Sequence, residues 1–152
     1  KRRNPSDLKL VLLGELLVGD PARPDIVVTG FVDEPTRNGA LAGARALVHP
    51  SYFESFAMVL TEAFAQRRPA LVQRRCTVLD GHAHRSGGAL PYTGFAEFEA
   101  AVDQLQASPG LADAMGEAGR RYVERDYDWD VVISRYDRML DEVSGRSLIR
   151  AT

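Results

Sequence analysis

Short apolar runs alternate with segments of helical composition along this sequence, and this alternation limits its possible folds more than any other feature. The runs are rich in aliphatic and β-branched residues and occupy positions 8–13, 26–29, 46–49 and 69–72. The first run is almost continuously apolar, which is typical of a strand buried on both faces of a parallel sheet. Strands that alternate with helices favour a parallel sheet with right-handed crossovers. The sequence therefore predicts an α/β fold, with a Rossmann-like parallel sheet flanked by helices.

The helices are predicted from apolar spacing and helix-forming composition. One short helix follows Pro35, and a second covers residues 57–66. Residues 76–88 are predicted as loop and turn, followed by a short extended piece at 89–90. The last third contains three amphipathic helices, at 95–106, 111–125 and 129–143. We expect a group of side chains near the end to pack these helices onto the sheet: Tyr122, Val123, Tyr127 and Trp129.

Composition narrows the class of protein. The 152 residues, 45% hydrophobic and 26% charged, suit one compact domain covering residues 1–152. A net charge of −2 and a pI near 5.9 show no basic excess, which argues against nucleic acid as a partner. The lone Cys76 fits a reducing compartment. No apolar run approaches the roughly 18 residues of a membrane span, and no signal peptide precedes the first strand, so we expect a cytoplasmic protein.

Candidate binding loops follow from the predicted sheet. Ligands of open parallel sheets bind beyond the carboxyl ends of the strands, which here means the loops at Gly14, at 30–33 and at 51–57. In the third loop Ser55 is a candidate N-cap, so the free backbone N–H groups of residues 57–59 would face an anion such as a diphosphate.

Two glutamates bracket this predicted helix start. Glu54 precedes the helix and could accept hydrogen bonds from sugar hydroxyls, whereas Glu62 lies about two turns into the helix, at ribose depth. Taken alone, either carboxylate could be an ordinary solvated charge. The pattern around them therefore decides between the two interpretations.

That pattern resembles a known family. Pro50-Ser51, then Glu54, Ser55-Phe56 and finally Glu62-Ala63, eight positions after the first glutamate, resemble the E-x7-E signature of family 4-like retaining glycosyltransferases. Three further segments also resemble that family, and the resemblance covers residues 8–143: Thr29–Asp33, Arg68–Val72, and Gly116–Tyr127 with Trp129. It implies the C-terminal, donor-binding domain of a GT-B glycosyltransferase (glycosyl transferases group 1).

The resemblance also implies a function and a site. The whole enzyme would transfer a hexosyl group from a nucleoside diphosphate sugar, with retention and without a metal or other cofactor. Glu54 would contact the reacting sugar and is the candidate catalytic residue, Glu62 would bind the ribose, and Val32 would lie by the base. The implied donor-binding set is Gly14, Phe31, Val32, Glu54, Ser55, Phe56, Ala57, Met58, Val59 and Glu62.

The chain opens on Lys1 without an initiator methionine, so we expect a domain of a longer protein whose own N-terminal domain binds the acceptor. We also expect the first strand of this domain, with the diphosphate-binding arginine and lysine, to be missing. The 152 residues alone would then be inactive. Membrane-surface association through the missing domain is an expectation of the same kind.

Departures from the family pattern leave alternatives open. Ala57 stands where glycine is common, and Arg68 stands where a glycine precedes the proline strand. A non-catalytic nucleotide-sugar-binding or scaffold domain of the same fold is the main alternative, and a sugar-nucleotide epimerase is a distant one. A metal site is disfavoured because the spacing of its four candidate ligands matches no common zinc pattern: Cys76, Asp80, His82 and His84. Residues 85–88 are predicted as an ordinary turn.

Overall fold

The computed structural model describes residues 7–17, 19 and 23–144, which belong to two compact units, one up to Ala40 and one from Leu41 onward. The first unit contains strands β1 (Leu10–Leu12) and β2 (Ile26–Val28), which pair in parallel with Val11 opposite Val27. Helix α1 (Glu34–Gly43) begins in this unit and ends in the next. Neither strand contains a buried residue. The prediction that the first run is buried on both faces is therefore wrong for the described residues.

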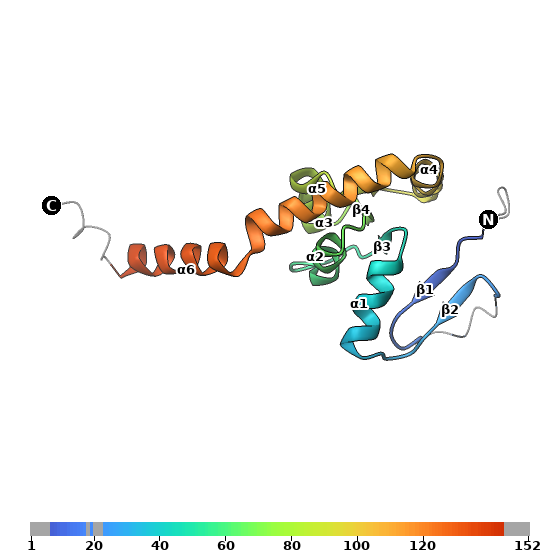
Figure 1. Ribbon diagram of the computed structural model, residues 1–152, viewed down its shortest axis with the longest axis horizontal. Helices are drawn as coiled ribbons and strands as arrows, with labels where there is room; N and C mark the ends of the chain where they lie inside the picture. The colour runs from blue at the N-terminus through green and yellow to red at the C-terminus, as the bar shows by residue number, and fades with distance from the viewer. Residues whose placement is uncertain (1–6, 18, 20–22, 145–152) are drawn as a thin grey trace. The chain divides into compact units, whose positions relative to one another are not determined.

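A parallel three-stranded sheet organises the second unit (Figure 1). The strands lie in the order β3 (Leu47–His49), β4 (Ala70–Gln73) and β5 (Ala89–Tyr92). Their order in the sheet is the same as in the sequence, with β4 in the centre. All four residues of β4 are buried. A central strand covered on both faces has this burial pattern, as the apolar run at 69–72 predicts.

Helices cover both faces of this sheet. They are α2 (Met58–Ala65), α3 (Thr77–Ser86), α4 (Phe95–Ala107) and α5 (Pro109–Tyr127). Helix α6 (Trp129–Val143) follows α5 and does not cover the sheet. Side chains of β4 alternate between two clusters, because successive residues of a strand point to opposite faces. Val72 packs with α2, α3 and Tyr122 of α5, whereas Leu71 packs with α4 and Met115 of α5. This arrangement confirms the predicted parallel strands flanked by helices.

Glycines let α5 approach α2 closely. A Cβ at Gly119 would lie 2.6 Å from Cδ1 of Phe64, and one at Gly116 would meet the backbone carbonyl of Arg67. A Cβ at Gly88 would in turn lie 2.8 Å from Cα of Gly119. The small residues of the segment 116–119 are thus a packing requirement of the core.

Two predictions about helices are corrected by the structure. Residues 77–86 form α3 where a loop was predicted, with Leu79, His82 and Ala83 buried. Tyr122 is buried as expected, but α6 contains no buried residue and Trp129 is 77% exposed. In Figure 1 α6 extends away from the three strands. Within the part of the chain that is described, no helix has the length and apolar character needed to cross a membrane.

Candidate functional site

The loop between β3 and α2, residues 50–57, lies at the carboxyl end of β3 and carries four of the ten predicted site residues. Its first turn is closed by Ser51, whose hydroxyl donates to the carbonyl of Phe53 at 2.8 Å. Ser55 and Phe56 are exposed farther along the loop. The structure thus places these residues where the parallel-sheet rule expects a ligand.

The N-cap of helix α2 lies two residues later than the predicted N-cap, Ser55. Ala57, not Ser55, is the N-cap, and it has left-handed backbone angles of φ 66° and ψ 60°. No side chain caps the helix. The first N–H groups of an α-helix have no partner within the helix, so those of Met58 and Val59 give this end a partial positive charge that suits an anion.

The two glutamates occupy different environments. Glu54 is partly buried on the loop, and its Oε1 lies 3.3 Å from Nε2 of His49 at the end of β3. The buried His49 nitrogen makes no hydrogen bond, so this contact is an electrostatic approach without good alignment. Glu62 is partly buried in the second turn of α2. Their roles in sugar and ribose binding stay predictions.

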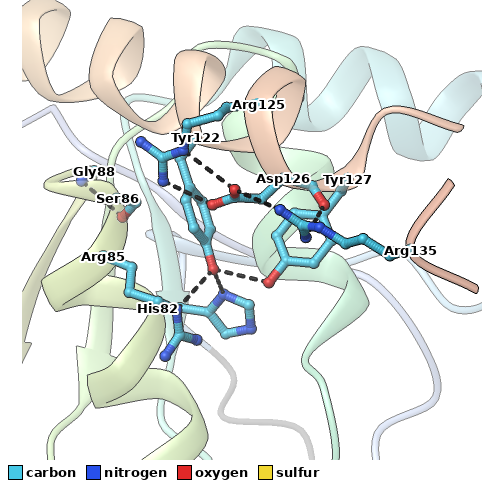
Figure 2. Close-up of polar contacts among 9 residues, drawn as sticks. All are labelled: His82, Arg85, Ser86, Gly88, Tyr122, Arg125, Asp126, Tyr127 and Arg135. Carbon is cyan, nitrogen blue, oxygen red and sulfur yellow. Dashed lines mark hydrogen bonds and ion pairs between the residues drawn. The ribbon is translucent and has the colours of Figure 1, made fainter. Parts of the chain in front are cut away.

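Phe56 is anchored to the core by a residue that sequence reasoning assigned to a loop. Nε2 of His82 lies 2.8 Å from the carbonyl oxygen of Phe56. Its Nδ1 lies 2.9 Å from the hydroxyl of Tyr122, as Figure 2 shows. The Phe56 ring packs edge-on against His82 and Tyr127, with ring centroids 5.4 and 5.2 Å apart. The spacing of Cys76, Leu79 and Ala83, three and four positions apart, was the available signal for this helix.

Around Tyr122 the polar contacts continue. Its hydroxyl lies 2.8 Å from that of Tyr127 and receives Nε–H of Arg85 at 3.2 Å. Burial, followed by the hydrogen bond to Tyr122, raises the pKa of Tyr127 to about 12, so this hydroxyl keeps its proton at neutral pH. Figure 2 also shows Asp126 between Arg125 and Arg135, with a shortest contact of 2.7 Å to Arg125.

The remaining predicted site residues lie in the first unit. Gly14 and Gly30 form an antiparallel bridge beyond the ends of β1 and β2, with N–H of Gly14 donating to the Gly30 carbonyl at 2.9 Å. Phe31 is 86% exposed and Val32 is partly buried. Hydrogen bonds from Thr36 lower the pKa of the neighbouring Asp33. That these residues share one site with Glu54 stays a prediction.

The candidate metal ligands separate within and beside α3. His84 lies 3.7 Å from the carboxylate of Asp80 on the helix surface, while His82 points into the core and Cys76 is buried. Among residues 7–17, 19 and 23–144, no three His, Cys, Asp or Glu side chains are grouped to hold a metal ion. Arg85 and Ser86, predicted as a turn, form the last turn of α3, and Gly87 ends it with φ 64°.

A pocket of about 350 Å³ opens at the carboxyl ends of β3, β4 and β5. Aromatic side chains dominate its lining, among them Tyr52 from the loop and Tyr92 at the end of β5. Glu54 does not line it. None of the ten predicted donor-binding residues lines this pocket.

Known proteins resemble this chain in sequence and in structure. A D-inositol 3-phosphate glycosyltransferase of Streptomyces bingchenggensis is 35% identical over 91 residues, which are 57% of this chain and 19% of that protein. A sucrose-phosphate synthase from Thermosynechococcus elongatus matches 95% of this chain and 39% of its own with a TM-score of 0.69, at 21% identity. The chain thus spans about a fifth of the curated relative and about two fifths of the solved one.

The structural match confirms the predicted fold class, parallel strands flanked by helices as in a GT-B glycosyltransferase. The family model for glycosyl transferases group 1 matches residues 20–122, more than half of the sequence, and includes the loop before α2 and both glutamates. This chain belongs to the glycosyl transferases group 1 family.

Proposed function

We propose that this chain is the donor-binding part of a retaining glycosyltransferase that transfers a hexosyl group from a nucleoside diphosphate sugar to an acceptor. The observation that carries the proposal is the start of α2, which has no side-chain cap and follows a loop with a partly buried glutamate. An acceptor domain outside these residues is the proposed partner. The proposal includes a cytoplasmic location and needs neither nucleic acid nor a metal cofactor.

The proposed chemistry is electrostatic. As the bond between the sugar and the diphosphate breaks, negative charge grows on the leaving phosphate and positive charge on the sugar ring. Backbone N–H groups at Met58 and Val59 are fixed by the helix, so they can stabilise the growing negative charge without rearranging. Glu54 precedes this helix start and would act on the sugar ring. Glu62, one helical turn farther on, would hold the ribose hydroxyls.

The first test concerns Glu62. In the full-length protein, Glu62→Ala should weaken nucleoside diphosphate binding by about 1–3 kcal/mol, the scale of losing charge-assisted hydrogen bonds. Calorimetric titration measures the change, and Glu142→Ala, on the exposed helix α6, is the matched control. Unchanged affinity in Glu62→Ala would rule out the ribose role.

The second test separates binding from turnover at Glu54. In the full-length protein, Glu54→Gln should keep nucleoside diphosphate affinity near that of the parent, because neither ribose nor phosphate contacts this side chain in the proposal. Its kcat with the sugar donor should fall, because an interaction with the reacting ring is lost.

Three measurements on Glu54→Gln distinguish the alternatives: nucleotide affinity, product formation and melting temperature. A solvated glutamate would change none of them, and a structural one would lower all three together. Normal stability with lost nucleotide affinity would mean that the two glutamates have exchanged roles. A parent protein that binds nucleotide sugar without any turnover would favour the non-catalytic alternative.

A further inference from the structure

His82 links the loop before α2 to the core by both of its ring nitrogens. The residue is 1% exposed. Its two partners are distant in the sequence, Phe56 by 26 positions and Tyr122 by 40. The two contacts, at 2.8 and 2.9 Å, have the length of good hydrogen bonds. A buried histidine with both nitrogens paired is a fixed connection between α3, α5 and the loop.

The partners determine where the protons lie. The carbonyl of Phe56 can only accept, so Nε2 of His82 must carry a hydrogen. Burial above all, with help from the Arg85 charge, lowers the pKa of His82 and keeps the ring neutral, although the bond to Phe56 opposes this. Nδ1 is then an acceptor and receives the hydroxyl proton of Tyr122.

This assignment of the His82 protons also fits the hydrogen bonds at the Tyr122 hydroxyl oxygen. The Tyr122 oxygen, having donated its proton to His82, can accept twice, and two donors face it: Nε–H of Arg85 and the hydroxyl of Tyr127 (Figure 2). The protons of the group therefore point in one direction, from Arg85 and Tyr127 through Tyr122 to His82 and on to Phe56. Reversing the His82 tautomer would set Nε2 against the Phe56 carbonyl, two acceptors facing one another.

This chain of hydrogen bonds acts on the peptide between Phe56 and Ala57. In a planar trans peptide the C=O and N–H groups point in opposite directions. A donor that holds the Phe56 carbonyl toward the core therefore directs the N–H of Ala57 away from the core. It also helps to hold Ala57 in the left-handed region, which is sterically unfavourable for a residue other than glycine.

We propose that His82, as the neutral tautomer protonated at Nε2, is a positioning residue that orients the loop carrying Glu54 and the backbone N–H groups at the start of α2. This inference rests on the proposed function for what the loop does, but the orientation itself can be measured without a donor. His82 contacts the loop backbone, and Tyr122, Tyr127 and Arg85 hold His82 in the required state.

The experiment uses the full-length protein with three variants. His82→Phe keeps an aromatic ring and loses the donor, His82→Gln keeps an N–H donor at a similar distance, and His84→Phe is the control, on the exposed side of the same helix. We expect His82→Phe to lower kcat by on the order of tenfold to a hundredfold, the scale of a misplaced reacting group. His82→Gln should recover most of the loss, and His84→Phe should match the parent.

Two measurements need no sugar donor. Long-range ¹⁵N correlation of the His82 ring should show a hydrogen on Nε2 and none on Nδ1. Amide exchange at Leu60, whose N–H donates to the Ala57 carbonyl at 2.9 Å, should become faster in His82→Phe by about tenfold or more, because the first turn of α2 is no longer held. If His82→Phe does not fold, Tyr122→Phe replaces it, and the same two signals should change to a smaller extent.

The outcomes separate the two proposals. A parent without transferase activity, but with the Nε2–H tautomer and a Leu60 amide exchange rate that depends on His82, would contradict the proposed function and leave the orientation supported. An active parent whose His82→Phe variant keeps kcat and Leu60 amide protection would overturn the positioning role. An Nδ1–H tautomer in the parent would also overturn it, whatever the activity.

Discussion

The two ends of helix α2 face a similar conformational problem and resolve it differently. Before the helix, Ala57 has φ 66°, and after it, Arg67 has φ 55°, both in the region that favours glycine. At the C-terminal end, N–H of Arg67 donates to Phe64 and N–H of Arg68 donates to Ala63, each at 2.9 Å. These two bonds form a Schellman motif, which the local backbone closes by itself.

At the N-terminal end no comparable backbone motif holds Ala57. The preceding carbonyl is held by His82, which comes from another helix and is itself held by Tyr122. A helix end closed by its own backbone is a scaffold feature and tolerates many residues. An end oriented by buried side chains depends on distant parts of the chain, and this is the end where the proposed donor site lies.

The largest expected effect on stability comes from the packing of α5 against the C-terminal end of α2. Gly116→Ala would place a methyl group against the carbonyl of Arg67, so we expect a loss of about 1–3 kcal/mol in the free energy of unfolding. Urea denaturation measures it. Gly110→Ala is the control, because no atom lies within 4 Å of its added Cβ. Equal stability of the two variants would show that α5 does not press on this end of α2.

Glycine substitutions compare the two ends directly. Arg67→Gly should stabilise the fold by up to about 1 kcal/mol, because glycine adopts the left-handed conformation without steric cost. Ala57→Gly should gain less, since the Ala57 methyl group is 5% exposed in the core and its loss offsets the relief. Thermal unfolding of both variants tests the order.

Arg67→Gly also removes an ion pair with Glu117, which is 2.8 Å long and half exposed, so the comparison needs a control for its loss. Glu117→Gln measures its contribution, which for an exposed pair is about 0–1 kcal/mol. A larger gain from Ala57→Gly than from Arg67→Gly, after this correction, would reverse the comparison.

The smallest expected effect is a pH dependence of stability that arises from His82, at the N-terminal end of α2 only. The pKa of His82 is lowered in the folded protein, chiefly by burial, whereas in the unfolded chain it has its ordinary value of 6.5. Below that pH the unfolded state therefore binds the proton first, and the free energy of unfolding falls as the pH decreases toward the lowered folded pKa. The slope decreases as the pH rises through 6.5 and vanishes well above it, where the ring is neutral in both states.

The contribution of His82 can be isolated by denaturant unfolding of the parent and of His82→Gln at several pH values. The two proteins share all other titrating groups. The parent should lose stability more steeply as the pH falls below 6.5. Parallel curves would show that His82 binds protons equally in both states.

Sequence patterns predicted the elements whose signal is local. The buried strand β4 follows from its apolar run, and α2 follows from helix formers between two glutamates. Sequence reasoning missed α3, because Gly81 and two histidines weaken its helical composition and outweighed the spacing of its apolar residues. It also placed the helix cap at Ser55, since that residue has the side chain of a cap. The left-handed Ala57 moves the helix start to Met58.

A second correction concerns the turn before β4. The resemblance placed its missing glycine at Arg68, but the left-handed residue is Arg67. Backbone conformation decides which position of a turn needs glycine, and residue identity alone does not reveal it when arginine occupies the position. The helix C-cap bonds identify the position directly.

The sequence by itself determined local features: which segments are strands and helices, with the exception of α3, and the family motif from Pro50 to Ala63. The amphipathic pattern of α6 specified a helix but not a partner, and Trp129 is exposed. Tertiary structure alone decided that His82 meets the carbonyl of Phe56, because a hydrogen bond between residues 26 positions apart depends on how α3 packs against α5 and the sheet. Periodicity describes one element at a time, whereas the geometry of the loop before α2 is set where three elements meet.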